Sequence, residues 1–172
     1  MTLQAITVLG HDRPGIIAET TRILADLGLN LEDSTMTLLR GHFAMTLICA
    51  GDTGSADVEA ALAPLTADDT LMVAVREVPV ESVPEAVGAS YVLTVHGGDR
   101  PGIVSRVAGE VARVGGNITD LTTRLAGELY ILVAEVDLPA AADVDVLQES
   151  LRAAAADLGV GVTLREVESD EL

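Results

Sequence analysis

Two short segments of the chain carry residue types that could bind a small charged molecule. Residues Gly10–Gly15 have the sequence GHDRPG, and Gly97–Gly102, 87 residues further along, have the sequence GGDRPG. Each segment offers a carboxylate, Asp12 or Asp99, next to an arginine and between glycines. A carboxylate accepts hydrogen bonds from an ammonium group, and glycine lets a ligand come close to the backbone. The repeated residues are mainly turn and polar types, which indicates a site at this shared loop.

The repetition extends beyond these segments. When Ile6–Ile48 is laid over Leu93–Glu135 without a gap, many positions are identical: Thr7, Val8, Gly10, Asp12, Arg13, Pro14, Gly15, Ile16, Ala25, Gly28, Asn30, Asp33, Thr35 and Leu38. A repeat of this length is too long for a solenoid, so we expect two small domains. The expected boundaries are residues 1–80 and 90–168 for the domains, 81–89 for a linker and 169–172 for an acidic tail.

Each half shows the same succession of hydrophobic patterns. Strands are predicted at Leu3–Gly10, Asn30–Leu39, His42–Ala50 and Leu71–Pro79, and again at Tyr91–Gly97, Asn117–Ala126, Glu128–Leu138 and Gly161–Val167. A first helix follows Pro14 or Pro101, each placed for its first turn, and ends at Gly28 or Gly115. Second helices are predicted at Ser55–Leu65, shortened by Pro64, and at Ala142–Leu158.

The order of elements is therefore βαββαβ, written twice. Such a unit forms an antiparallel four-stranded sheet with both helices on one face. The predicted fold class is α+β, with two tandem ferredoxin-like domains.

Charge and composition exclude several kinds of function. The formal net charge is −17, with ten arginines, no lysine and three aromatic residues. Direct nucleic-acid binding needs a cationic surface, and RNA modules of similar element order stack bases on strand aromatics, so neither DNA nor RNA is an expected partner. No apolar run approaches the length of a membrane span, and the N-terminus has no basic region typical of a secretory signal. We expect a cytoplasmic protein.

Catalytic and metal motifs are missing from the sequence. Cys49 is the only cysteine and lies in an apolar run, FAMTLICAG, typical of a buried strand. His11, His42 and His96 do not have the spacing of a local metal motif. No nucleophile elbow, zinc-protease helix or phosphate-binding loop is present. The sequence predicts neither an enzyme, nor a cofactor, nor a metal site.

The DRPG(I/V) segment between the first strand and the first helix, with Asn30 and Asn117 opening the second strand, resembles the ACT domain family. The resemblance covers both halves. Two such domains without a catalytic domain resemble the glycine cleavage system transcriptional repressor group. The family binds small effectors, most often amino acids, between two ACT domains. The loop comes from one domain and the start of the second strand from its neighbour.

Carried onto this chain, the resemblance implies two ligand sites. One combines Gly10, His11, Asp12 and Gly15 with Asn117. The other combines Gly97, Gly98, Asp99 and Gly102 with Asn30. The copies differ where His11 corresponds to Gly98 and Glu32 to Thr119, so the two sites could differ in affinity or only one could be used.

Structural roles for the same residues are the alternatives. Asp12 and Asp99 could cap the first helix, Asn30 and Asn117 could be turn residues, and Arg13 and Arg100 could form surface ion pairs.

The expected function is a small regulatory protein that binds an amino acid, glycine or a serine-like one, and signals through a protein partner such as a transcription activator. A homodimer is the expected assembly. The alternatives are a ligand-independent dimerisation module and an accessory subunit of an enzyme of amino-acid metabolism.

Overall fold

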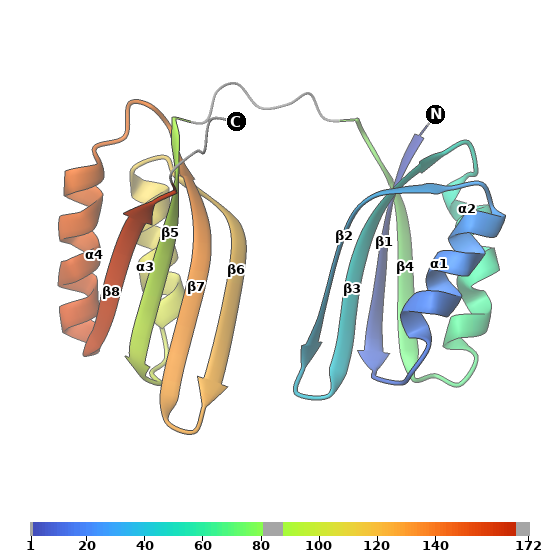
Figure 1. The fold of residues 1–172 in the computed structure, drawn as a ribbon, viewed down its shortest axis with the longest axis horizontal. Coiled ribbons are helices and arrows are strands. Elements are labelled where there is room, and N and C mark those ends of the chain that lie inside the picture. The colour runs from blue at the N-terminus through green and yellow to red at the C-terminus, as the bar shows by residue number, and fades with distance from the viewer. Residues whose placement is uncertain (1, 81–87, 168–172) are drawn as a thin grey trace. The chain divides into compact units, whose positions relative to one another are not determined.

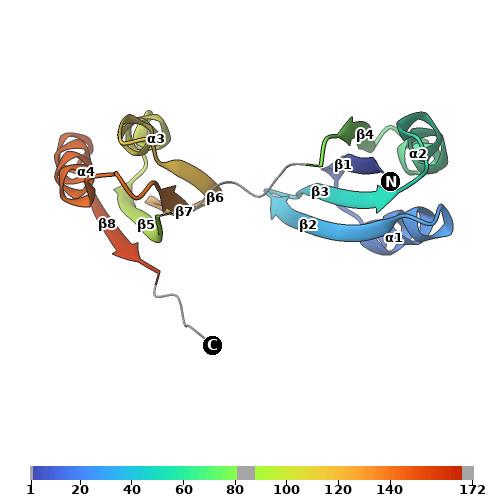
Figure 2. The same ribbon diagram turned by 90° about the horizontal axis from the view of Figure 1, so that it is seen from above.

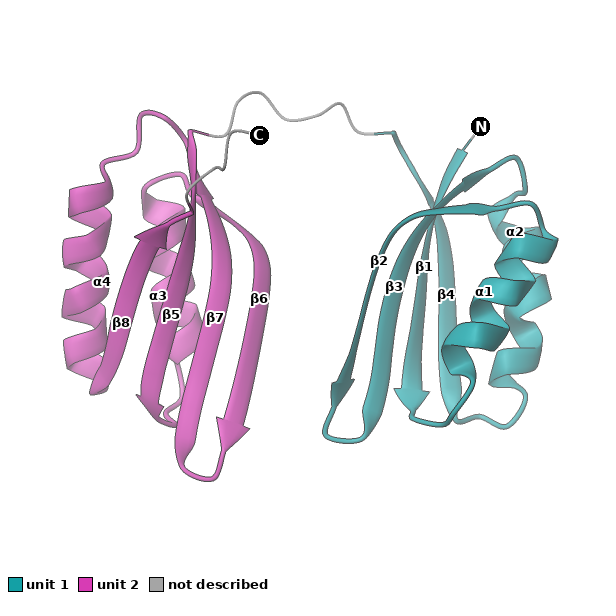
Figure 3. Ribbon diagram, in the orientation of Figure 1, with its two compact units in different colours: residues 1–82 teal, residues 83–172 magenta. Residues whose placement is uncertain are grey.

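The computed structural model describes residues 2–80 and 88–167. The chain divides into two compact units, Met1–Ser82 and Val83–Leu172 (Figure 3). Most of the predicted linker, residues 81–87, and the predicted acidic tail lie outside the described residues.

The first unit follows the predicted order of elements. Its strands are β1 (Thr2–His11), β2 (Asn30–Leu39), β3 (His42–Gly51) and β4 (Leu71–Val78), and its helices are α1 (Ile16–Asp26) and α2 (Ser55–Leu62). The strands pair antiparallel in the order β2-β3-β1-β4. Both helices cover one face of this sheet (Figure 1).

The second unit repeats the arrangement. Its strands are β5 (Ala89–Gly98), β6 (Asn117–Ala126), β7 (Leu129–Leu138) and β8 (Val160–Glu166), and its helices are α3 (Ile103–Arg113) and α4 (Val144–Leu158). The sheet order β6-β7-β5-β8 matches that of the first unit. Figure 2, which looks from above, shows α3 and α4 on the same side of their sheet. Each unit is thus a ferredoxin-like βαββαβ fold, as the sequence predicts.

Each unit has its own core between the helices and one sheet face. Alternate residues of the central strands point into it: Ile6 and Val8 from β1, and Leu93 and Val95 from β5, are fully buried. This alternation is the pattern of a sheet with one covered face. The other face of each sheet is free of helices within its unit, so it presents the intervening residues.

The helix boundaries differ from the prediction. Pro14 and Pro101 precede their helices, which begin at Ile16 and Ile103. Helix α2 ends at Leu62 rather than Leu65, and a 3₁₀ turn follows at Ala63–Thr66. Pro64 explains this early end, because proline cannot donate the hydrogen bond that would continue the helix.

Helix α4 begins at Val144, two residues later than predicted. The Asp143 side chain accepts a hydrogen bond from the Val146 backbone N–H at 3.1 Å. It therefore occupies the capping position and sets the start of the helix.

Within residues 2–80 and 88–167, no helix combines the length and apolar composition needed to cross a bilayer.

Candidate functional site: the loop between the first strand and the first helix

The GHDRPG loop of the first unit leaves the sheet at the end of β1. The backbone N–H of His11 donates to the Thr70 carbonyl at 2.9 Å, and that of Asp12 donates to the Gly41 carbonyl at 3.3 Å. These bonds tie the loop to the start of β4 on one side and to the β2–β3 turn on the other. The loop is therefore held by backbone contacts, which leave the side chains of His11 and Asp12 exposed.

The glycines of the two loops have distinct structural roles. A Cβ at Gly10 would overlap the carbonyl oxygen of Thr70, and a Cβ at Gly97 would lie 2.8 Å from Cγ1 of Val160. Gly15 and Gly102 have left-handed backbones, with φ of 91° and 93°, and open space beside them. The strand-end glycines, Gly10 and Gly97, are required for close packing. The glycines before the helices, Gly15 and Gly102, let the chain turn into the helix.

Both first helices begin without a side-chain cap. In α1 the first helical bond runs from the Glu19 N–H to the Gly15 carbonyl, and in α3 from the Arg106 N–H to the Gly102 carbonyl. Neither Asp12 nor Asp99 accepts a capping hydrogen bond. The capping alternative for these two residues is therefore wrong, because a left-handed glycine stands at the cap position instead.

The arginines of the two loops have different neighbours. Arg13 forms an ion pair with Glu19 at 3.0 Å, as one of the alternatives predicted. Residue 106 replaces Glu19 in the second copy and is an arginine. Arg100 lies against Gly159 at the end of α4, where a Cβ would be 3.6 Å from its Nη2. A helix C-terminus carries partial negative charge, which suits a guanidinium there.

The turn before β4, which holds Asp68 and Thr70, adjoins the GHDRPG loop in the first unit, because the Thr70 carbonyl accepts from the His11 N–H. The Asp68 carboxylate accepts hydrogen bonds from the Thr70 hydroxyl at 2.7 Å and the Thr70 N–H at 3.1 Å. These bonds, the hydroxyl first, lower the pKa of Asp68, and the positive charge of Arg13 adds to the effect.

Asn30 and Asn117 lie far from the loop of their own unit. Asn30 is opposite Ala50 at one end of the first sheet, in line with Leu3, whereas Gly10 is opposite Phe43 near the other end. Seven residues of strand separate Leu3 from Gly10, which is about 24 Å. Asn117, opposite Asp137, is in the same position in the second sheet. Within one unit, the loop and the asparagine cannot contact the same small ligand.

An open pocket of about 570 Å³ borders the loop of the first unit. It lies beside the edge strand β4 and is lined by Leu9, Gly10, Thr66, Asp69, Thr70, Leu71, Met72 and Val73. Gly10 is the only predicted site residue in its lining.

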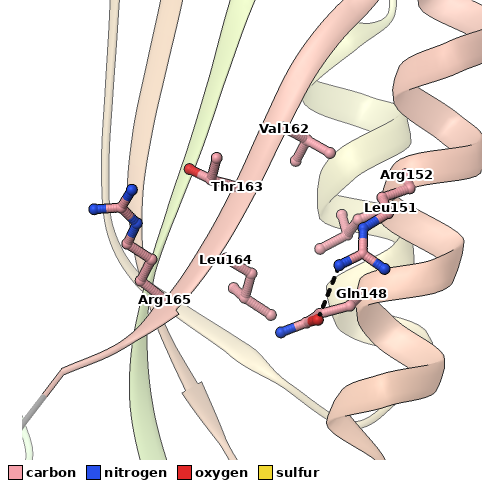
Figure 4. A pocket seen from close by; sticks show the side chains of 7 residues that line it. All are labelled: Gln148, Leu151, Arg152, Val162, Thr163, Leu164 and Arg165. Carbon is pink, nitrogen blue, oxygen red and sulfur yellow. Dashed lines mark hydrogen bonds between the residues drawn. The ribbon is translucent and has the colours of Figure 1, made fainter.

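Another pocket, of about 230 Å³, lies in the second unit between α4 and the edge strand β8. Arg152 and Gln148 share a hydrogen bond on its helix side, and Arg165 points away on the other side of β8 (Figure 4). None of the predicted site residues lines it.

Cys49 is buried in β3, as predicted. Burial raises the pKa of its thiol, and the negative charge of Glu32 raises it further. Among residues 2–80 and 88–167, no three His, Cys, Asp or Glu side chains gather as metal ligands would.

The model of the ACT domain family matches the chain twice, at residues 3–76 and 90–165. The chain is a member of the ACT domain family. The two matches coincide with the two units, so each unit is one ACT domain.

The relatives of this chain differ in how much of the tandem they share. The glycine cleavage system transcriptional repressor of Escherichia coli strain K12 is 27% identical over 161 residues, covering 89% of this chain and 84% of that protein. A UPF0237 protein of Methanopyrus kandleri is 45% identical over 58 residues, or 34% of this chain. The match spans 62% of that relative's length.

Two solved structures share the tandem fold. A protein of unknown function from Galdieria sulphuraria has a TM-score of 0.81 and 26% identity, over 97% of this chain and 99% of that one. A protein proposed to be a glycine cleavage system transcriptional repressor has a TM-score of 0.71 and 18% identity, with 98% of both chains covered.

Proposed function

We propose that this tandem ACT protein is a cytoplasmic regulator that binds a free amino acid where two ACT domains pair. Glycine or a serine-like amino acid is the proposed effector. The bound state would be read by a protein partner, for example a transcription activator. The similarity to a glycine cleavage system transcriptional repressor over 89% of this chain supports this direction.

The observation that carries the proposal is the construction of the repeated loop. In each domain a left-handed glycine stands at the start of an uncapped helix, and an exposed aspartate lies three residues before it. The unpaired N–H groups at the start of a helix attract a carboxylate. The aspartate, free of a capping role, can accept from an ammonium group. Both ends of an amino acid thus find a complementary group at one loop.

The asparagines can complete the site only from a second domain, which is part of the proposal. Strands β2 and β6 are the edge strands of their sheets, and an edge strand can pair with a strand of another domain or chain. In an antiparallel pairing of these edges, Asn117 at the start of β6 would lie beside the end of β2. That end joins the turn at Gly41, whose carbonyl accepts from the Asp12 N–H. By the same symmetry Asn30 would approach the loop of Asp99.

Through such pairing, the bound amino acid would regulate how the domains are arranged. A ligand that contacts two domains stabilises their paired arrangement relative to the unpaired one. The size of this effect is set by the difference in the ligand's affinity for the two arrangements. The acidic surface, with a net charge of −17, would then be presented differently to a basic partner.

A ligand-independent pairing module is the second candidate. The helix-free face of the first sheet exposes large apolar side chains at Leu9 (40%), Leu39 (48%) and Met72 (57%). Leu9 and Met72 lie directly opposite each other on neighbouring strands, and exposed apolar side chains that lie side by side are typical of an interaction surface.

Thermal unfolding in the presence of each of the twenty amino acids, at millimolar concentration, separates the two candidates. A ligand with few heavy atoms is expected to bind with micromolar to millimolar affinity. At a hundred times its dissociation constant it would stabilise the folded protein by about 2.7 kcal/mol. Stabilisation by one or a few amino acids supports the sensor. No shift with any of them refutes it and leaves the pairing module.

A further inference from the structure

We propose that His11 and His42 form a binding site for a divalent transition-metal ion of the class that prefers imidazole nitrogen, such as Zn²⁺ or Ni²⁺. The two histidines are 31 positions apart in the sequence, and β1 and β3 place them directly opposite each other. Metal binding at this pair does not require an amino acid, although the pair shares His11 with the predicted amino-acid site.

The hydrogen-bond pattern shows that His11 and His42 form the kind of antiparallel pair whose side chains lie closest together. The His11 N–H donates to Thr70 beside β4, so it points away from β3. In an antiparallel strand the N–H and C=O of one residue point to the same side. His11 and His42 therefore form a non-hydrogen-bonded pair across β1 and β3, in which opposite side chains approach most closely, with Cβ atoms about 4.5–5.5 Å apart.

Both imidazoles lie on the helix-free face of the sheet. The neighbouring pair, Gly10 and Phe43, belongs to the core side, because Phe43 is buried. Side chains alternate along a strand, so His11 and His42 share the open face, and both are exposed. A cation can reach them from solvent without displacing any core residue.

The backbone around the pair is held in place. The His11 N–H bonds to Thr70, and the Asp12 N–H bonds to the turn at Gly41, one residue before His42. Fixed backbones on both sides reduce the ordering that a bound ion must impose. The protein's net negative charge attracts cations, although Arg40 beside the turn opposes them locally.

Two imidazoles with water in the remaining positions make an open metal site. Imidazole favours Zn²⁺, Ni²⁺ and Cu²⁺, whereas Mg²⁺ and Ca²⁺ require oxygen ligands. The second domain provides an internal comparison, since Gly98 and Leu129 occupy the corresponding pair. We therefore expect one site per chain.

Titration calorimetry of the full chain, without a histidine tag, tests the proposal with Zn²⁺, Ni²⁺ and Mg²⁺. We expect one Zn²⁺ or Ni²⁺ per chain and no binding of Mg²⁺. His11→Asn and His42→Asn should each weaken binding at least tenfold, and His96→Asn, on β5, should leave it unchanged. Retention of affinity in either of the first two variants, or loss in the third, would overturn the proposal.

A gain of function gives a second, independent test. A Cβ on Gly98 would have open space around it, with no neighbouring atom within 4 Å, and residue 98 does not need a left-handed backbone, so a side chain fits there. Gly98→His combined with Leu129→His should raise the stoichiometry to two ions per chain. A stoichiometry that stays at one in a folded double variant, checked by circular dichroism, would contradict the geometric argument.

Discussion

Gly10 and Thr70 are so close that no side chain fits at residue 10. A Cβ on Gly10 would overlap the carbonyl oxygen of Thr70, and the same oxygen accepts a hydrogen bond from the next residue, His11. The contact therefore fixes the point at which the loop leaves β1. Gly97 has the matching role in the second domain, where Val160 takes the place of Leu71 in the strand register.

The first prediction concerns the two kinds of glycine in the loop. Gly10→Ala should destabilise the protein by about 3 kcal/mol or more, because a backbone overlap must be relieved as well as a backbone preference. Gly15→Ala should cost about 1–2 kcal/mol, since only its left-handed backbone opposes the change. Urea unfolding measures both. Equal losses for the two variants would contradict the packing role of Gly10.

The second prediction separates loop aspartates from a true helix cap. Asp143→Ala should cost about 1 kcal/mol, because it removes the hydrogen bond to Val146 at the start of α4. Asp12→Ala and Asp99→Ala should change the free energy of unfolding by less than about 0.5 kcal/mol. A loss near 1 kcal/mol for either loop aspartate would mean that it stabilises its helix after all.

The third prediction concerns the thiol of Cys49. A raised pKa leaves less thiolate at a given pH, and burial blocks access, so the native protein should react very slowly with a disulfide reagent. The rate should rise sharply in denaturant. Glu32→Gln should change the native rate little, because burial is the larger cause of the raised pKa. Fast reaction of the native protein would show that the Cys49 side chain is not buried in solution.

The fourth prediction concerns the turn before β4. Thr70→Val removes the hydroxyl that most strongly lowers the pKa of Asp68, so that pKa should move up toward its usual value. A carboxyl with a lowered pKa stabilises the fold above its unfolded pKa, and this contribution is lost as the pH falls through the lowered value. The stability of the variant should therefore depend less on pH in the acid range.

A carboxyl NMR titration measures the Asp68 pKa directly. Thr66→Val is the matched control, because the Thr66 hydroxyl donates to the Ala63 carbonyl instead. An unchanged pKa in Thr70→Val would rule out the hydroxyl as its cause.

Much of the fold follows from the sequence because its signals are local. The residue types and their spacing predict the alternation of buried residues in β1 and β5. They also predict the glycines that end α1 and α3. The end of α2 and the start of α4 differ from the prediction by two or three residues. In those places single residues, Pro64 and Asp143, decide the boundary through one hydrogen bond lost or gained.

Features that depend on strand register could not be predicted in the same way. The pairing of His11 with His42 follows from the register of β1 on β3, which no motif in either segment reveals. The resemblance to the ACT domain family, rather than a pattern in the residues alone, implies a site made of each loop and the asparagine of the other half. The strand register adds the physical reason for taking the asparagine from the other half, because about 24 Å of strand separates the loop from the asparagine of its own domain.

The central claim is that the repeated loop binds an amino acid with help from an asparagine of a second domain. Titration calorimetry with the most stabilising amino acid tests it on Asp12→Ala with Asp99→Ala, on Asn30→Ala with Asn117→Ala, and on Asp143→Ala as a control. Each charge-assisted contact is worth about 1.5–3 kcal/mol. Both double variants should therefore bind at least about tenfold more weakly, while the control keeps its affinity. Unchanged affinity in either double variant would contradict the claim.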